Sequence, residues 1–115
     1  MSMGHDSTAT SKKNAKKEHK KNVARLKVTL NPSIPPEILT QLARDENHYV
    51  RIGVALNPST PPEVLAELAR DRSTVVRLSV AQNSSRFDYI LLDLIDDNNE
   101  GVREAALTTM HSDLD

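Results

Sequence analysis

The sequence predicts an all-α fold, a solenoid in which short helices stack in one direction, and three observations support this prediction. From about residue 23 the chain repeats itself every 26 residues, which is the signature of a repeat architecture. Each copy contains two short apolar stripes with the spacing of one helix face. Neither stripe is long enough for a helix that is stable alone, because isolated helices shorter than about 12–15 residues are marginal. Each copy must therefore pack against the next one.

Composition indicates one small domain outside the membrane. The 115 residues are 37% hydrophobic and 27% charged, which fits a soluble globular chain. The absence of cysteine excludes disulfides, thiolate metal sites and thiol catalysis. No apolar run is long enough for a secretory signal or a membrane span, so we expect a cytoplasmic protein without membrane contact.

A lysine-rich N-terminal arm, residues 1–22, is predicted to be disordered because it has almost no bulky apolar side chain to bury. Residues 1–27 hold eight Lys or Arg against two acids, whereas residues 28–115 hold seven Arg against fourteen acids. The arm's paired lysines recur with a spacing of four, which would align them along one side of a helix. They are Lys12, Lys13, Lys16, Lys17, Lys20 and Lys21.

Three interpretations of this arm stay open. It is a solubilising tail, an anchor on nucleic-acid phosphates, or a contact for an acidic protein surface. It has no aromatic residue to stack on bases and no apolar face to enter a membrane.

The repeats begin at residue 23 with half a unit, and the sequence predicts about three and a half units in residues 23–115. The half repeat covers 23–30, and the full repeats cover 31–56, 57–82 and 83–110. We expect first helices at about 35–44, 61–70 and 86–96, and second elements, either α or 3₁₀, at about 48–56, 74–82 and 100–110.

Helix starts are most clearly marked in the middle copy. There Thr60 is a candidate N-cap, Pro61 would take the first helical position, and Glu63 would complete a capping box. In the third copy the box is expected at Ser85 and Asp88. The predicted core consists of two leucine rows with the 26-residue spacing, Leu39, Leu65 and Leu91 and then Leu42, Leu68 and Leu94.

Three polar series share the same spacing, and we interpret them as a structural ladder rather than as a binding strip. An aspartate can cap a helix or pair with an arginine of its own or the next repeat, and an asparagine at a turn can satisfy backbone groups of the adjoining repeat. The series are Asn31, Asn57 and Asn83; Arg25, Arg51, Arg77 and Arg103; and Asp45, Asp71 and Asp97.

Residues 50–81 contain Val-Arg-x-x-Val-Ala twice, separated by an Asn-Pro turn, a Pro-Pro-Glu helix start, spaced leucines and an Asp turn. This pattern resembles the leucine-rich repeat variant family, and the resemblance extends over about residues 23–110. It implies a right-handed superhelix of alternating α and 3₁₀ or short α elements, akin to HEAT-like scaffolds, in which no signature position is catalytic. Family members are mostly bacterial. One carries an iron–sulfur cluster on N-terminal cysteines, a feature that cannot apply to this cysteine-free chain.

No catalytic or metal-binding constellation emerges from the sequence. The four histidines, His5, His19, His48 and His111, are scattered without a partner at helical spacing. We therefore expect no enzymatic activity and no cofactor.

The third first helix carries more apolar bulk than its sisters. Tyr89 and Leu92 replace charged or smaller residues, and they lie three apart on the predicted solvent face beside Asp93 and Asp96. Apolar side chains with a polar rim commonly mark a contact surface.

Two interpretations of this surface stay open: the C-terminal segment, with Met110 and Leu114, covers it, or it is a homodimer or partner interface. The sequence thus predicts a scaffold that binds another protein through its solenoid surface. The alternative is an accessory nucleic-acid-binding protein that uses the lysine arm.

Overall fold

The computed structural model describes residues 25, 27, 29–83 and 87–112. The secondary structure of these residues is helical, with no strand among them, so the all-α prediction is confirmed for them. Six helices have defined bounds there: α2 (Pro36–Leu42), α3 (His48–Leu56), α4 (Pro62–Leu68), α5 (Thr74–Gln82), α6 (Asp88–Leu94) and α7 (Glu100–Ser112). The predicted arm, residues 1–22, lies outside the described residues.

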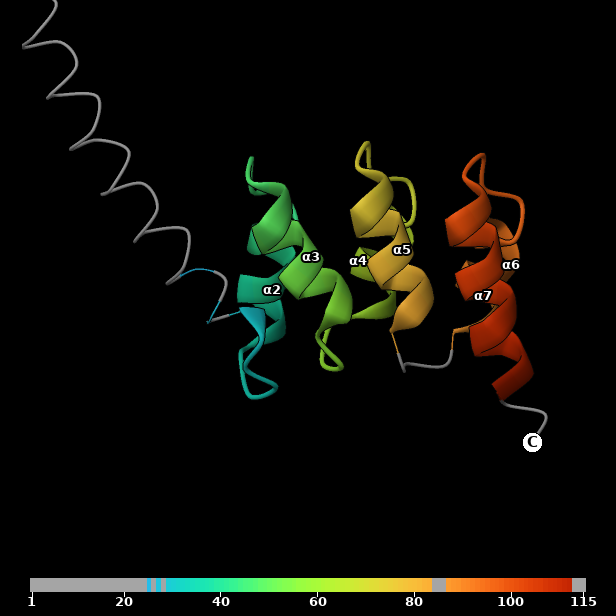
Figure 1. Ribbon diagram of the computed structural model, residues 1–115. Coiled ribbons are helices and arrows are strands. Elements are labelled where there is room, and N and C mark those ends of the chain that lie inside the picture. The colour runs from blue at the N-terminus through green and yellow to red at the C-terminus, as the bar shows by residue number, and fades with distance from the viewer. Residues whose placement is uncertain (1–24, 26, 28, 84–86, 113–115) are drawn as a thin grey trace, which may run out of the picture.

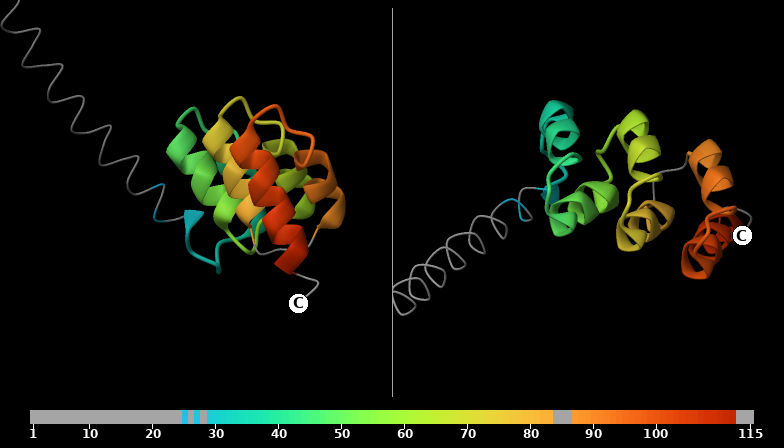
Figure 2. Two further views of the ribbon diagram at one scale, coloured as in Figure 1. Left: turned by 45° about the vertical axis from the view of Figure 1, so that its right-hand side comes forward. Right: turned by 90° about the horizontal axis from the view of Figure 1, so that it is seen from above.

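The helices form three pairs, α2–α3, α4–α5 and α6–α7, which stand in a row (Figure 1). Figure 2 shows two layers, with α2, α4 and α6 in one and α3, α5 and α7 in the other. Within the second layer, α3 contacts α5 and α5 contacts α7. The handedness of the superhelix stays a prediction.

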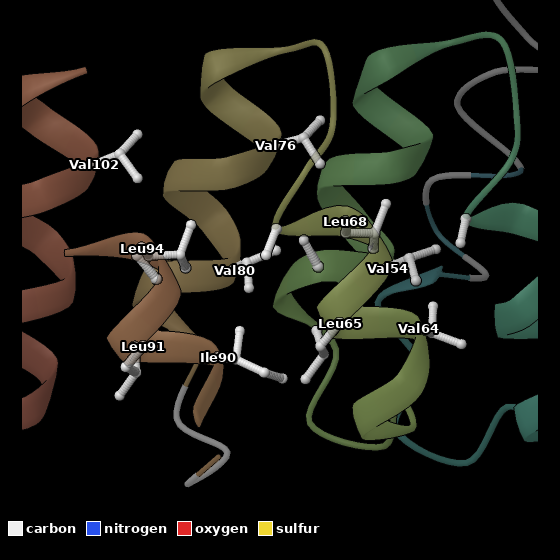
Figure 3. Packing of buried hydrophobic residues seen from close by; sticks show 14 of the residues in the cluster. Val54, Val64, Leu65, Leu68, Val76, Val80, Ile90, Leu91, Leu94 and Val102 are labelled. Carbon is white, nitrogen blue, oxygen red and sulfur yellow. The ribbon is translucent and has the colours of Figure 1, made fainter. Parts of the chain in front are cut away.

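The core runs along the row of pairs, between the two layers. Leu39, Leu65 and Leu91 are at most 3% exposed, and Leu68 and Leu94 are buried as well. Leu42 is half-buried and packs against the same cluster. Figure 3 shows the labelled core side chains following one another from α3 to α7.

Ile38 departs from this pattern, because it is 37% exposed whereas its counterparts Val64 and Ile90 are buried. Among the described residues, no first helix precedes α2, whereas α2 precedes α4 and α4 precedes α6. The apolar periodicity of the sequence does not reveal this end effect.

The predicted capping box of the middle copy is wrong. Pro61 is the N-cap, it makes no side-chain cap bond, and Pro62 begins the helix. Thr60 is buried, and its Oγ1 donates instead to the carbonyl of Val54 near the end of α3 at 2.7 Å. The hydroxyl thus satisfies a carbonyl at the end of one helix rather than an N–H at the start of the next.

The capping box predicted for the third copy is also wrong. The N-cap of α6 is Phe87, which makes no side-chain cap bond, and Asp88 is the first residue of the helix. Ser85 lies outside the described residues. All three second elements are α-helices, and α7 continues to Ser112, two residues beyond its predicted end.

Asparagine side chains connect successive turns. Asn57 Nδ2 donates to the carbonyls of Thr29 and, at 3.0 Å, of Asn31. Asn83 Nδ2 donates to the carbonyls of Ala55 at 2.6 Å and Asn57 at 3.3 Å. Both amides are buried, so each bond satisfies polar groups that water cannot reach.

The next place in this series is taken by Thr109, which the sequence analysis did not identify. It follows Asn83 by 26 residues, and its Oγ1 donates to the carbonyl of Ala81 at 2.6 Å. The hydroxyl of Thr109 therefore makes one of the two hydrogen bonds that an asparagine amide makes in the preceding units.

Arginine–aspartate pairs connect the same units in the second layer. Arg51 Nε and Nη2 donate to the two carboxylate oxygens of Asp71 at 2.8 and 3.2 Å. Arg77 binds Asp97 in the same way at 2.8 and 3.3 Å. Arg25 Nε lies 3.5 Å from Asp45 Oδ2. Each arginine thus pairs with the aspartate 20 residues ahead, in the next unit.

The guanidinium groups of Arg51 and Arg77 also donate a hydrogen bond to the turn before their own helix. Arg51 Nη1 donates to the carbonyl of Asp45 at 2.8 Å, and Arg77 Nη1 donates to that of Asp71 at 2.7 Å. Burial alone would raise the pKa of Asp97. The hydrogen bonds from Arg77 and from the Asn99 N–H, with the charges of Arg77 and Arg103, lower that pKa below its ordinary value.

We expect Leu65→Ala to lower the free energy of unfolding by about 2–5 kcal/mol, because it leaves a cavity in a fully packed core. Leu92→Ala is the matched control, since the same atoms are removed from a side chain that is 52% exposed. Urea unfolding followed by circular dichroism measures both. Equal losses for the two variants would contradict the proposed core.

We expect Asp97→Asn to lower the free energy of unfolding at neutral pH by about 1.5–3 kcal/mol, because a charged hydrogen-bond acceptor is lost. A lowered folded-state pKa stabilises the fold above the unfolded pKa of about 4 and ceases to do so as pH falls through the folded value. The difference from the parent should therefore shrink below about pH 4. Asp93→Asn, in an exposed pair, should cost at most about 1 kcal/mol. A difference that stays constant down to acid pH would contradict the role of the Asp97 charge.

Candidate functional site

An open groove of about 740 Å³ lies between α4 and α6. Its apolar lining includes Ala66 and Ala69 from α4 and its C-terminal end, and Tyr89, Ile90 and Leu92 from α6. Tyr89 is 59% exposed and Leu92 is 52% exposed. The groove thus offers apolar surface that the described part of the fold does not bury.

The local sequence explains why these side chains point outward. Ile90, Leu91 and Leu94 of α6 are buried in the core. Tyr89 and Leu92, three residues apart, therefore occupy the opposite side of the same helix.

The rim of the groove is acidic. Glu63, Glu67 and Asp93 line it together with one cation, Arg70. Arg70 Nε lies 3.7 Å from Asp93 Oδ2, and the two side chains are 81% and 53% exposed. One positive charge thus faces three negative ones, and the rim favours cationic ligands.

The same ion pair occurs one unit earlier, where Arg44 Nε lies 3.3 Å from Glu67 Oε1. In that unit, the residues equivalent to Tyr89 and Leu92 are Glu63 and Ala66. In α6, tyrosine therefore replaces a charged side chain and leucine enlarges an apolar one.

Of the four residues predicted for the partner surface, Tyr89, Leu92 and Asp93 line this groove, whereas exposed Asp96 does not. Met110 packs against the core cluster and leaves Tyr89 and Leu92 exposed. Leu114, the other residue expected to cover them, lies outside the described residues.

The contributions of Glu67 and Arg70 were missed in the sequence analysis. Their signal is present in the repeat, since Arg44–Glu67 and Arg70–Asp93 are the same pair 26 residues apart. The lysines from Lys12 to Lys21 lie outside the described residues, and the nucleic-acid arm stays a prediction.

Among residues 25, 27, 29–83 and 87–112, no group of three or more His, Cys, Asp or Glu side chains is arranged to hold a metal ion. No helix in the same residues has the length and apolarity that a bilayer crossing requires.

Comparison with known proteins identifies one family. The family model described as leucine rich repeat variant matches residues 50–73, from α3 through α4 to the turn that contains Asp71. Searches of curated proteins and of solved structures gave no match. Residues 50–73 are therefore similar to the leucine rich repeat variant family, as the pattern of residues 50–81 predicted.

Proposed function

We propose that this protein is a helical-repeat scaffold that binds a segment of another protein in the groove between α4 and α6. The groove, with two large exposed apolar side chains inside an acidic rim, is the observation that carries the proposal. Leucine rich repeat variant units are helical repeat modules that often occur in protein-interaction scaffolds. They belong to a structural repeat family, and we assign no reaction to the chain.

In this proposal the 26-residue units 31–56, 57–82 and 83–110 form a right-handed solenoid that extends the matched unit in both directions. A rigid row of this kind presents residues that differ between units, such as Tyr89 and Leu92, at fixed positions. Specificity then comes from those differences rather than from the shared ladder.

The chemistry of the groove specifies its ligand. Tyr89 and Leu92 suit an apolar side chain, since aromatic and aliphatic anchors dominate the centre of protein interfaces. Glu63, Glu67 and Asp93 suit lysine or arginine on either side of that anchor. The expected partner is a segment with an apolar residue flanked by basic ones.

We expect a random peptide library selected on the protein to yield such segments. The test variant combines Tyr89→Glu and Leu92→Thr, the residues of the first unit at these places. It should bind the selected peptides at least about tenfold more weakly in fluorescence anisotropy, a loss of about 1.4 kcal/mol.

Tyr49→Glu is the matched control, because Tyr49 is 62% exposed on α3, in the other layer. It should leave binding unchanged, and both variants should unfold like the parent. Failure to enrich peptides, or equal binding by the double variant, would contradict the groove as the site.

The alternative function, nucleic-acid binding, is favoured by one observation, the run of paired lysines within residues 1–27, which have a net charge of +6. Binding of duplex DNA or RNA should then be independent of sequence and weaken steeply between about 50 and 200 mM salt, because counterions are released. Replacement of the six lysines by glutamine should abolish it in fluorescence anisotropy. No binding at the lower salt concentration would exclude this function.

A further inference from the structure

Arg103 on α7 occupies the place that Arg51 and Arg77 hold on α3 and α5. In those two units the guanidinium has two fixed contacts. Nη1 donates to a turn carbonyl before the helix, and the edge formed by Nε and Nη2 binds a carboxylate of the next unit.

Arg103 makes the first of these contacts, because its Nη1 donates to the carbonyl of Asp97 at 2.8 Å. None of the ion pairs among the described residues involves Arg103, and the carboxylate of Asp97 is bound by Arg77. The guanidinium of Arg103 is thus anchored to the preceding turn as in the other two units, where the edge formed by Nε and Nη2 meets a carboxylate of the next unit.

Leu107 lies one helical turn beyond Arg103, on the same side of α7. The equivalent residues, Ala55 and Ala81, are fully buried under the next unit, whereas Leu107 is 41% exposed. The outer face of α7 therefore combines an oriented cation with an apolar side chain.

The bulk of Leu107 also restricts what can bind there. Ala55 and Ala81 let the next second helix approach closely, and leucine in their place holds a helix further away. The face consequently suits a turn, whose carboxylate can reach the guanidinium, better than another copy of this repeat.

We propose that the outer face of α7 is a docking surface for an acidic turn of another protein. An aspartate of that turn binds Nε and Nη2 of Arg103 in the two-point geometry of Asp71 and Asp97, and an apolar neighbour of the aspartate covers Leu107. This ligand is anionic, unlike the cationic segment proposed for the groove, so the two surfaces do not compete for one partner.

The probe is a capped peptide with the sequence of residues 94–99, Leu-Ile-Asp-Asp-Asn-Asn, which combines two apolar residues with the aspartate of this turn. It is titrated into full-length protein labelled with ¹⁵N-arginine, and the side-chain Nε–Hε signals are followed by NMR. Arg103→Lys assigns the relevant signal. The Arg103 signal should shift saturably, and a peptide with both aspartates replaced by asparagine should not shift it.

Two arginines in the same sample are internal controls. The fork of Arg77 is already filled by Asp97, and its signal should stay in place. Exposed Arg72 reports unspecific attraction of the acidic peptide. Leu107→Ala should weaken the saturable shift of Arg103. An Arg103 shift no larger than that of Arg72 would overturn the proposal.

Sedimentation velocity of the protein alone tests the competing occupant, a second copy of the chain. A single species at all concentrations is expected. Self-association that disappears in Arg103→Gln would assign the face to a second copy and overturn its assignment to another protein. Neither the NMR titration nor the sedimentation experiment depends on Tyr89 or Leu92. A negative result for the α7 face therefore does not affect the function proposed for the groove.

Discussion

Helices of seven to nine residues, the lengths of α2 to α6, do not persist in water on their own, so each helix pair depends on the pair beside it. Burial of the leucine rows between neighbouring pairs supplies most of the required free energy. This burial is not directional, and it would tolerate small shifts of one pair along another. The polar ladder removes that freedom, because its donors and acceptors meet in one register.

The polar ladder consists of two series of contacts with different chemistry, one made by asparagine amides and one by arginine–aspartate pairs. The amides of Asn57 and Asn83 are buried and bond to backbone carbonyls, so a shifted register would leave those carbonyls without a partner. Arg51 and Arg77 each join the turn before their own helix to a carboxylate of the next unit. The desolvation of these ion pairs offsets much of their attraction, and we therefore ascribe the spacing of the pairs, more than the total stability, to them.

The 26-residue period was sufficient to predict the helices and the core, because residues 26 apart are similar in type and occupy equivalent packing positions. It could not predict how Thr60 is used. A threonine before a proline-rich helix start can cap that helix or bond backward, and the choice depends on where the carbonyl of Val54 lies in space. The exposure of Ile38 was hidden for a related reason, since periodicity describes an interior unit and not an end.

Both proposed surfaces arise where the chain departs from its own repeat by enlarging a side chain. Leu92 stands where α4 has Ala66, and Leu107 stands where α5 has Ala81. At each place the added bulk is exposed rather than buried. The neighbouring charges differ, with Glu67 and Asp93 beside the first and Arg103 beside the second. A repeat scaffold can in this way present two apolar contacts of opposite electrostatic preference without altering the core or the ladder that hold it together.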